Sequence, residues 1–223
     1  MRIEYLNLKL GFESITIYII RGRDGDILID TGFCYGLDKI EKWLSGYNIK
    51  YIFITHGHLD HVWNAALLKE KLGAKLLIHE NDRLLPNQFA SQKLYPLIPK
   101  YKCRTFFTNI CGKLMVPKSF KADYITGKDT DFFKKLGFNA EIVMLPGHTN
   151  GSMGIMHNNV LYCGDAFTMM FNKPEAVFFG HDIKRIISTM KKINDIAPTY
   201  LATGHGVPVK YDKAKVEFQK YIG

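Results

Sequence analysis

The chain has 223 residues, of which 47% are hydrophobic and 13% aromatic, and this composition is typical of a folded globular protein with a sizeable buried core. No apolar stretch approaches the roughly 18 uncharged residues that cross a bilayer, and the first residues carry scattered charges where a signal peptide has an apolar core. We therefore expect a cytoplasmic protein without a membrane partner.

The formal net charge of +9 is concentrated in one part of the chain. Between Arg83 and Lys135 there are eleven Lys or Arg residues and only three acids, so the rest of the chain is close to neutral. The four cysteines are widely spaced and include no C-x-x-C pair, so the spacing indicates neither a cysteine-based zinc site nor a disulfide framework. We expect reduced and mostly buried thiols.

The first third of the chain is predicted to alternate between strands and helices. A hairpin is expected from two β-rich runs joined by a turn of Gly, Arg and Asp, at 15–20 and 26–30. Apolar residues at helical spacing predict two helices, at 37–44 and 62–73. Short apolar runs predict two buried strands, at 50–55 and 74–79.

The regular pattern is lost between about 83 and 125, where four prolines interrupt a mixture of aromatic residues and lysines. We interpret this segment as a basic insertion or lid within a single domain that spans residues 1–223. Regular signals then return. They predict strands at 140–145, 152–157, 160–165 and 199–204, and helices at 182–195 and from about 211.

The stretch "ITHGHLDHVW" places three of the chain's eight histidines and one aspartate within six positions. His56 and His58 directly follow the predicted strand 50–55, and continued extension would direct both imidazoles to one point. Asp60 and His61 fall in the turn that enters the next helix, where they would face a second point nearby. Imidazoles with a carboxylate are suitable ligands for zinc, iron or manganese, so the stretch indicates a metal site.

The second half of the chain offers three more ligands of the same kind. His148, Asp165 and His205 each follow a predicted strand, and each has a glycine close by, where the backbone can approach a bound ion. Their recurrence at strand ends strengthens the prediction of a metal site.

Taken together, these motifs resemble the metallo-β-lactamase superfamily. The pattern H-x-H-x-D-H occupies residues 56–61, the later histidine, aspartate and histidine follow in the family's order, and "IDTG" at 29–32 is similar to an early strand-end motif of the family. The resemblance implies an α/β fold, specifically a four-layer αββα sandwich. It also implies two divalent metal ions, with zinc expected first and iron or manganese as alternatives.

The resemblance assigns a role to each ligand. His56, His58 and His148 would hold one metal ion, Asp60, His61 and His205 would hold the other, and Asp165 would bridge the two. Asp30 would orient a ligand by hydrogen bonding, although it could equally be a turn or helix-capping residue.

The activity that the resemblance implies is hydrolysis of a small, anionic ester, thioester or lactone by a hydroxide activated between the two metal ions. Asp60 would also orient the attacking water or accept its proton. Asp165 is typical of the glyoxalase II-like and lactonase-like branches, and the lactamases proper lack it. Thr168 stands where acyl-homoserine lactonases usually have tyrosine, and Val62-Trp63-Asn64 stands where glyoxalase II-like enzymes often have a glycine pair.

Two alternatives remain open at the level of sequence. Because lysine, arginine and aromatic residues suit phosphates and stacked bases, the basic segment is also compatible with a phosphodiesterase or nuclease acting on RNA or DNA. A sulfur dioxygenase would need a single iron ion, for which His56, His148 and Asp165 would serve. We place nucleic acid below small molecules as a partner, and the sequence indicates neither the substrate contacts nor the oligomeric state.

Overall fold

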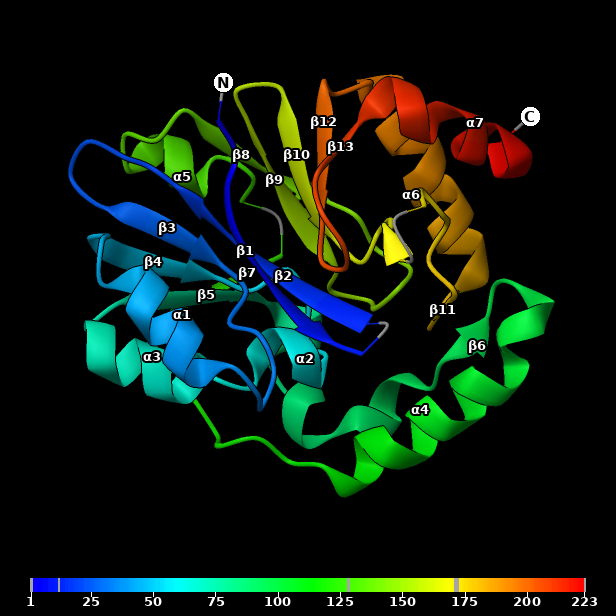
Figure 1. The fold of residues 1–223 in the computed structure, drawn as a ribbon, viewed down its shortest axis with the longest axis horizontal. Coiled ribbons are helices and arrows are strands. Elements are labelled where there is room, and N and C mark those ends of the chain that lie inside the picture. Colours follow the sequence, from blue (N-terminus) through cyan, green and yellow to red (C-terminus); the bar gives the residue numbers. More distant parts are fainter. Residues whose placement is uncertain (1, 12, 128, 171–172, 223) are drawn as a thin grey trace.

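The computed structural model describes residues 2–11, 13–127, 129–170 and 173–222, whose strands form two large sheets packed face to face (Figure 1). The first sheet has six strands in chain order: β1 (Glu4–Leu10), β2 (Glu13–Ile20), β3 (Asp26–Ile29), β4 (Ile49–Phe53), β5 (Lys75–His79) and β7 (Tyr124–Thr126). The second sheet has the spatial order β13-β12-β10-β9-β8. Its strands are β8 (Ala140–Met144), β9 (Met153–His157), β10 (Val160–Gly164), β12 (Tyr200–Thr203) and β13 (Val209–Lys210).

Alternation of side chains along the strands builds three apolar layers. On β3, Ile27 and Ile29 point into the space between the sheets, whereas Leu28 points outward to the helices on the first sheet. On β10, Val160 points into the same central layer and Leu161 points outward to the helices on the second sheet. All five side chains are almost fully buried.

Helices cover the outer face of each sheet. The first sheet packs against α1 (Leu37–Leu44) and α3 (Ala65–Leu72), and the second against α6 (Ile183–Ile196) and α7 (Tyr211–Ile222) (Figure 1). The molecule is therefore a four-layer αββα sandwich, and the predicted fold class is confirmed.

Most predicted elements are present within one or two residues of their predicted bounds, but the helix expected at 62–73 is broken. The chain forms α2 (Leu59–Val62), leaves helical geometry at Asn64, and resumes as α3. The Asn64 side chain explains the break, because its amide donates to the backbone carbonyls of Thr31 and Phe33 at 2.9 and 2.8 Å. It ties the helix entrance to the loop after β3.

The segment 83–125 contains more regular structure than we predicted. It forms short 3₁₀ turns at η2 (Leu85–Asn87), η3 (Phe89–Gln92) and η4 (Pro99–Tyr101), and a two-residue strand β6 (Tyr95–Pro96) that pairs with β11 (Phe179–Gly180). It also holds a helix of 13 residues, α4 (Lys102–Leu114), which lies at one side of the sandwich below β6 in Figure 1. A further turn, η1 (Glu80–Asp82), precedes the segment, and a short helix, α5 (Phe132–Lys135), follows it.

The prediction of mostly buried cysteines is wrong. Cys34, Cys103 and Cys111 are exposed, and only Cys163 is buried, while all four are free thiols as expected. In the part of the chain that the structure describes, no helix is both long enough and apolar enough to span a bilayer.

Candidate metal centre

The candidate site lies where the loops after five strands meet at one edge of the sandwich. Strands β3 and β4 run parallel in the first sheet, and β10 and β12 run parallel in the second, so the carboxyl ends of each pair lie together. The segments that follow these four strands and β8, including the short helix α2 after β4, carry all the residues predicted from sequence: Asp30, His56, His58, Asp60, His61, His148, Asp165 and His205.

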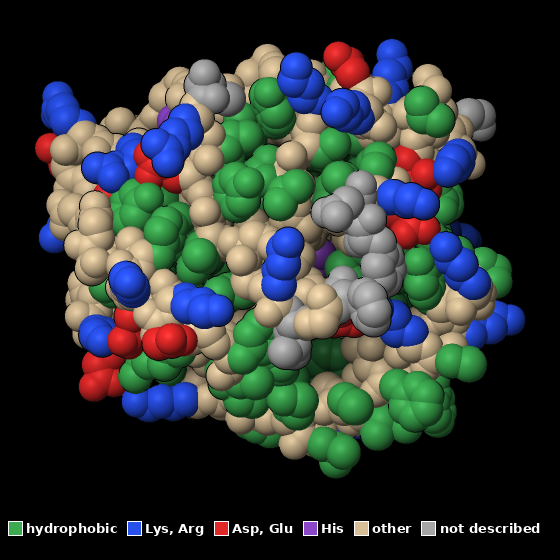
Figure 2. All heavy atoms as spheres, viewed as in Figure 1, with side chains coloured by type: hydrophobic (Ala, Val, Ile, Leu, Met, Phe, Trp, Pro, Cys, Tyr) green, Lys and Arg blue, Asp and Glu red, His purple; other side chains and the backbone are tan. Residues whose placement is uncertain are grey.

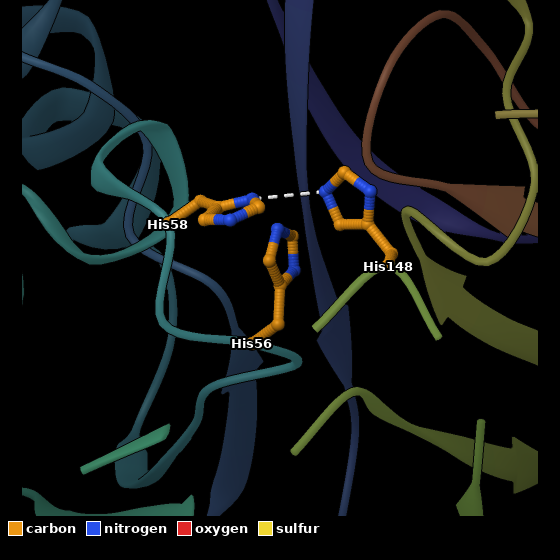
Figure 3. Close-up of side chains that lie close together, drawn as sticks. All are labelled: His56, His58 and His148. Atoms are coloured by element: carbon orange, nitrogen blue, oxygen red, sulfur yellow. Dashed lines mark hydrogen bonds between the residues drawn. The ribbon is translucent and has the colours of Figure 1, made fainter. Parts of the chain in front are cut away.

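Three histidines from the two halves form a buried triad (Figure 3). His56 and His58 come from the loop after β4, and His148 comes from the loop after β8. The ring centroid of His56 lies 4.7 Å from that of His58 and 4.8 Å from that of His148. Each residue offers one ligand atom, and these three atoms all lie within 4.8 Å of one another. This spacing suits a single metal ion.

A second triad, Asp60, His61 and His205, lies beside the first. The Asp60 carboxylate is 3.4 Å from Nε2 of His205 and 3.9 Å from Nε2 of His61. The structure thus brings together the two groups that we predicted as separate ligand sets, while their assignment to metal ions remains a prediction.

Asp165 lies between the triads. One of its carboxylate oxygens, Oδ1, is 3.4 Å from Nε2 of His61. The other, Oδ2, is 3.1 Å from Nε2 of His205 and 3.4 Å from Nε2 of His148. A carboxylate in this position reaches members of both triads at once.

Backbone carbonyls fix the direction of two of the imidazoles. The Nδ1 atom of His148 lies 2.9 Å from the carbonyl oxygen of Phe179, and Nδ1 of His205 lies 2.8 Å from that of Ser14. Because a carbonyl oxygen can only accept, each Nδ1 carries a proton, and each Nε2 faces the cluster. Nε2 of His148 lies 2.9 Å from Nδ1 of His58, the contact drawn in Figure 3.

Asp30 orients two more histidines. Its Oδ2 accepts the Nδ1 proton of His61 at 2.7 Å and also accepts the hydroxyl proton of Thr55 at 2.8 Å. The Thr55 oxygen, having donated to Asp30, can accept from Nδ1 of His56 at 3.1 Å. Asp30 adopts a left-handed backbone conformation, with φ of 61°, which a non-glycine residue rarely holds without compensating contacts.

Several buried polar atoms of the cluster form no hydrogen bond within the described chain. They are Nε2 of His56, Nε2 of His58, Nε2 of His61 and Oδ1 of Asp165. Buried polar groups are usually hydrogen-bonded, and leaving one unpaired costs about 1–3 kcal/mol. These four atoms belong to residues of two overlapping groups of ligands, and all are of types that bind metal, so they fit a site for cations.

The pKa values within the cluster divide into two groups. Burial lowers the pKa of His56, His58 and His148, because it disfavours the imidazolium form, so these rings are neutral and able to ligate near pH 7. Burial acts in the same direction on the other two histidines, but carboxylates outweigh it.

Asp30 is the main reason that the pKa of His61 lies well above its usual value, and Asp165 is the main reason that the pKa of His205 is raised to about 9. Burial opposes ionisation of Asp165, yet the adjacent His205 and His61 hold its pKa well below the usual range. Both histidines thus sit where positive charge is favoured, which also suits a bound cation.

One buried carboxylate that the sequence did not single out connects the two halves of the site. Asp82 is fully buried and accepts hydrogen bonds from the backbone of Gly57 at 2.9 Å and of Gly151 at 2.9 Å. It also accepts from Thr149 at 2.6 Å and from Gln92 at 3.0 Å. Gly57 lies between His56 and His58, whereas Thr149 follows His148, so Asp82 joins the two loops that form the first triad.

Aromatic rings form part of the surroundings of the cluster. The ring of Phe89 lies 5.4 Å from that of His58, and the ring of Phe179 stacks on His148 at 5.9 Å. Tyr35 lies near Asp60, and burial, followed by that carboxylate, raises the pKa of its phenol to about 12. The phenol therefore keeps its proton at neutral pH.

The three remaining histidines lie outside the cluster. The buried His79 accepts a hydrogen bond from the backbone of Asn81 at 3.1 Å. His157 donates to the carbonyl of Asn139, and His181 to that of Lys93.

Comparison with known proteins gives a consistent result. The family model described as the metallo-β-lactamase superfamily matches residues 10–205. The chain is 32% identical, over 121 residues, to hydroxyacylglutathione hydrolase GloC of Haemophilus influenzae, and the match covers 53% of this chain and 50% of that protein. The chain thus spans about half the length of that relative.

Two further matches cover most of the chain. The metallo-β-lactamase fold-containing protein ST1585 of Sulfurisphaera tokodaii is 23% identical over 208 residues, which are 87% of this chain and 73% of that protein. Among solved structures, TTHA1623 in a di-iron-bound form matches with a TM-score of 0.69 and 21% identity, over 96% of this chain and 98% of that chain. At this identity the structural match shows a shared fold.

Proposed function

The chain belongs to the metallo-β-lactamase superfamily, and from this premise we propose that it is a metal-dependent hydrolase of a small ester, thioester or lactone. The observation that carries the proposal is the set of buried ligand atoms without a hydrogen-bond partner in the described chain, contributed by both halves and belonging to residues whose ligand atoms cluster within 4.8 Å of one another in overlapping groups. Such an arrangement is costly without a cation and is expected where a cation binds.

We assign the ligands to two metal ions. His56, His58 and His148 would hold the first ion, and Asp60, His61 and His205 would hold the second. Asp165 would bridge them, and its short distances to members of both triads support this role.

The ligand set contains nitrogen and oxygen atoms but no thiolate, which suits zinc, iron or manganese. We propose zinc as the first candidate. The di-iron form of the related fold keeps iron as the main alternative.

When bound, such ions lower the pKa of a water molecule and polarise the carbonyl oxygen of a substrate. The residues of the chain supply orientation and proton transfer. The side chain of Asp60 is 32% exposed, against 8% for Asp165, so Asp60 is the carboxylate of the cluster that incoming water and substrate can reach. It is therefore the candidate to orient the attacking water and accept its proton.

The surroundings of the site favour a substrate with an apolar acyl part. Phe89 and Phe179 each lie against a histidine of the first triad, and apolar walls with a few polar groups are typical of small-molecule sites. The name of the relative from Haemophilus influenzae directs attention to thioesters. The protonated phenol of Tyr35 is a candidate donor to the substrate near Asp60.

A substrate panel tests the proposal. The zinc-loaded protein and its iron-loaded form would be assayed against carboxylic esters, thioesters, lactones, phosphodiesters and persulfides. We expect turnover of at least one acyl substrate, and we expect Asp60→Asn to lower kcat by about 10²- to 10⁴-fold, as loss of a general base does. Asp38→Asn, on the exposed start of α1, is the control and should leave the rate unchanged.

Other outcomes would replace the proposal. Activity confined to phosphodiesters would identify a phosphodiesterase or nuclease. Oxygen-dependent turnover of persulfides with one iron ion would identify a dioxygenase. A metal-loaded protein inert toward the whole panel would contradict hydrolysis of these substrate classes.

A further inference from the structure

Helix α4 is amphipathic in the opposite sense to an ordinary surface helix, because its apolar side chains face solvent. The outer face of α4 consists of Cys103, Phe106, Phe107, Ile110 and Leu114, which recur at the three- and four-residue steps of one helix face. Phe106 is 62% exposed, Phe107 63% and Leu114 78%. Figure 2 shows hydrophobic side chains gathered over the region where Figure 1 draws α4.

The inner side of α4 is polar or small, and specific contacts hold it in place. Asn109 both donates to and accepts from the backbone of Leu94 at 3.0 Å. Thr105, also on this side, donates to the carbonyl of Tyr101 at the start of the same helix at 2.9 Å. Gly112 lies so close to Phe89 that a Cβ atom there would be 2.6 Å from its ring. The apolar residues are therefore exposed on a well-anchored helix, and an exposed patch of this kind marks an interaction surface.

The charge around this face restricts the partner. Over residues 83–122 the chain contains no Asp or Glu and eight basic residues: Arg83, Lys93, Lys100, Lys102, Arg104, Lys113, Lys118 and Lys121. Lys102 and Lys113 lie near the two ends of α4, at the edge of the outer face, and neither has a carboxylate within ion-pair distance in the described chain. The partner that best fits this charge is anionic.

Two other kinds of partner fit the outer face of α4 less well. Glu13, Glu70 and Glu175 pair with Arg104, Lys118 and Lys100, but no carboxylate of the described chain pairs with Lys102 or Lys113. A second copy of the chain, docked through the same face, would bring these two lysines of both copies together and suffer repulsion. Single-stranded nucleic acid would use aromatic rings for stacking but would leave the aliphatic Ile110 and Leu114 without suitable contacts. A bilayer surface provides both acyl chains for the apolar residues and anionic headgroups for the lysines.

We propose that α4 docks on the surface of an anionic lipid bilayer, with its outer face in the headgroup–acyl boundary and Lys102 and Lys113 at the headgroups. This contact would lie on the surface of the membrane without crossing it. The expectation of no membrane partner concerned only segments that span the bilayer. The proposal does not depend on the hydrolase activity, because its readout is binding to vesicles.

Flotation of the zinc-loaded 223-residue protein with vesicles tests the proposal. The two probes are pure phosphatidylcholine vesicles and vesicles with about 30% phosphatidylglycerol added. We expect binding to the mixed vesicles that is at least about tenfold tighter than to the neutral ones and that weakens as salt is raised.

Two variants separate the apolar from the charged contribution. Phe107→Ser with Leu114→Ser should weaken vesicle binding by about tenfold or more, whereas Val216→Ser, at a position on α7 that is 66% exposed, should not. Lys102→Gln with Lys113→Gln should also weaken binding by about tenfold, against the control Lys213→Gln with Lys215→Gln on the exposed side of α7. Circular dichroism and zinc content would verify that every variant remains folded.

Three results would overturn the proposal. The first is no binding to the mixed vesicles. The second is equal binding by the wild type and both α4 variants. The third is self-association or binding of single-stranded RNA that the α4 substitutions abolish, in the absence of vesicle binding.

Discussion

At the scale of single residues, the candidate site depends on the groups that orient the proposed metal ligands as much as on the ligands themselves. Asp30 fixes His61 directly and His56 through Thr55, while carbonyls of Phe179 and Ser14 fix two further rings. Each of these contacts holds Nδ1 so that Nε2 faces the cluster. Loss of such a contact commonly lowers metal affinity by about 10- to 100-fold.

Asp82 provides the sharpest test of this outer layer. Asp82→Asn would replace one accepting oxygen by an NH₂ group that faces donors from Gly57, Thr149, Gly151 or Gln92. We expect the free energy of unfolding to fall by about 1–3 kcal/mol and zinc affinity to fall by about 10- to 100-fold. Denaturant titration and competition with a chromogenic chelator measure the two effects.

The control for this variant is Asp24→Asn, at a side chain that is 82% exposed. It should change neither quantity. An Asp82→Asn protein with unchanged zinc affinity would show that the two loops keep their positions without the carboxylate.

Gly204 tests how closely the backbone approaches the ligands. A Cβ atom at this position would lie 2.4 Å from Oδ1 of Asp165 and 2.6 Å from Cε1 of His61. We therefore expect Gly204→Ala to displace at least one of the two and to lower zinc affinity by about tenfold or more. Gly46→Ala, where the nearest heavy atom is 4.0 Å away, is the matched control. Equal affinities for both variants would contradict the position given to the two ligands.

The proposed ligands could be identified from the sequence, whereas Asp82 could not. His56, His58, Asp60 and His61 are dense in one short motif, and the remaining predicted ligands each follow a strand signal. The partners of Asp82 lie 10 to 69 residues away in the chain, and no local pattern marks a carboxylate of this kind.

At the scale of elements, apolar periodicity predicted the helices whose apolar face meets the core. Helix α1 has the bounds predicted, because Ile40 and Leu44 pack under the first sheet. Helix α4 was missed although its apolar residues recur at the steps of one helix face. The lysines and prolines around it obscured this period.

Short strands were also missed, for a different reason. Strand β7 pairs with β5, and the two are separated along the chain by the whole basic segment. Strand β11 likewise exists only through its pairing with β6. Non-local pairing of two or three residues leaves no periodic signal to detect.

The packing of helix α7 on the second sheet gives a prediction about stability. Phe218 is fully buried and stacks on Phe167 at 4.5 Å, two residues beyond Asp165. Phe218→Ala should lower the free energy of unfolding by about 3–5 kcal/mol through lost burial and a residual cavity, as measured by denaturant titration. The exposed neighbour substitution Val216→Ala should cost far less, and similar losses for both would contradict the packing of α7 on the second sheet.

At the scale of the whole molecule, the two halves are joined at the site itself. The backbone amide of Thr16 donates to Gly204 at 2.8 Å, and that of Met153 donates to Thr55 at 2.9 Å. Each proposed triad takes ligands from both halves, so neither half carries a complete set. The sandwich therefore positions the proposed ligands by bringing the ends of two parallel strand pairs together.

The central claim is that this junction holds two metal ions bridged by Asp165. The most direct test is the zinc content of the purified protein, measured by plasma mass spectrometry after saturation and removal of free metal. We predict about two zinc ions per chain for the wild type and no more than about one for Asp165→Asn. A saturated wild-type protein that retains one zinc ion or none, or an Asp165→Asn protein that retains two, would contradict the claim.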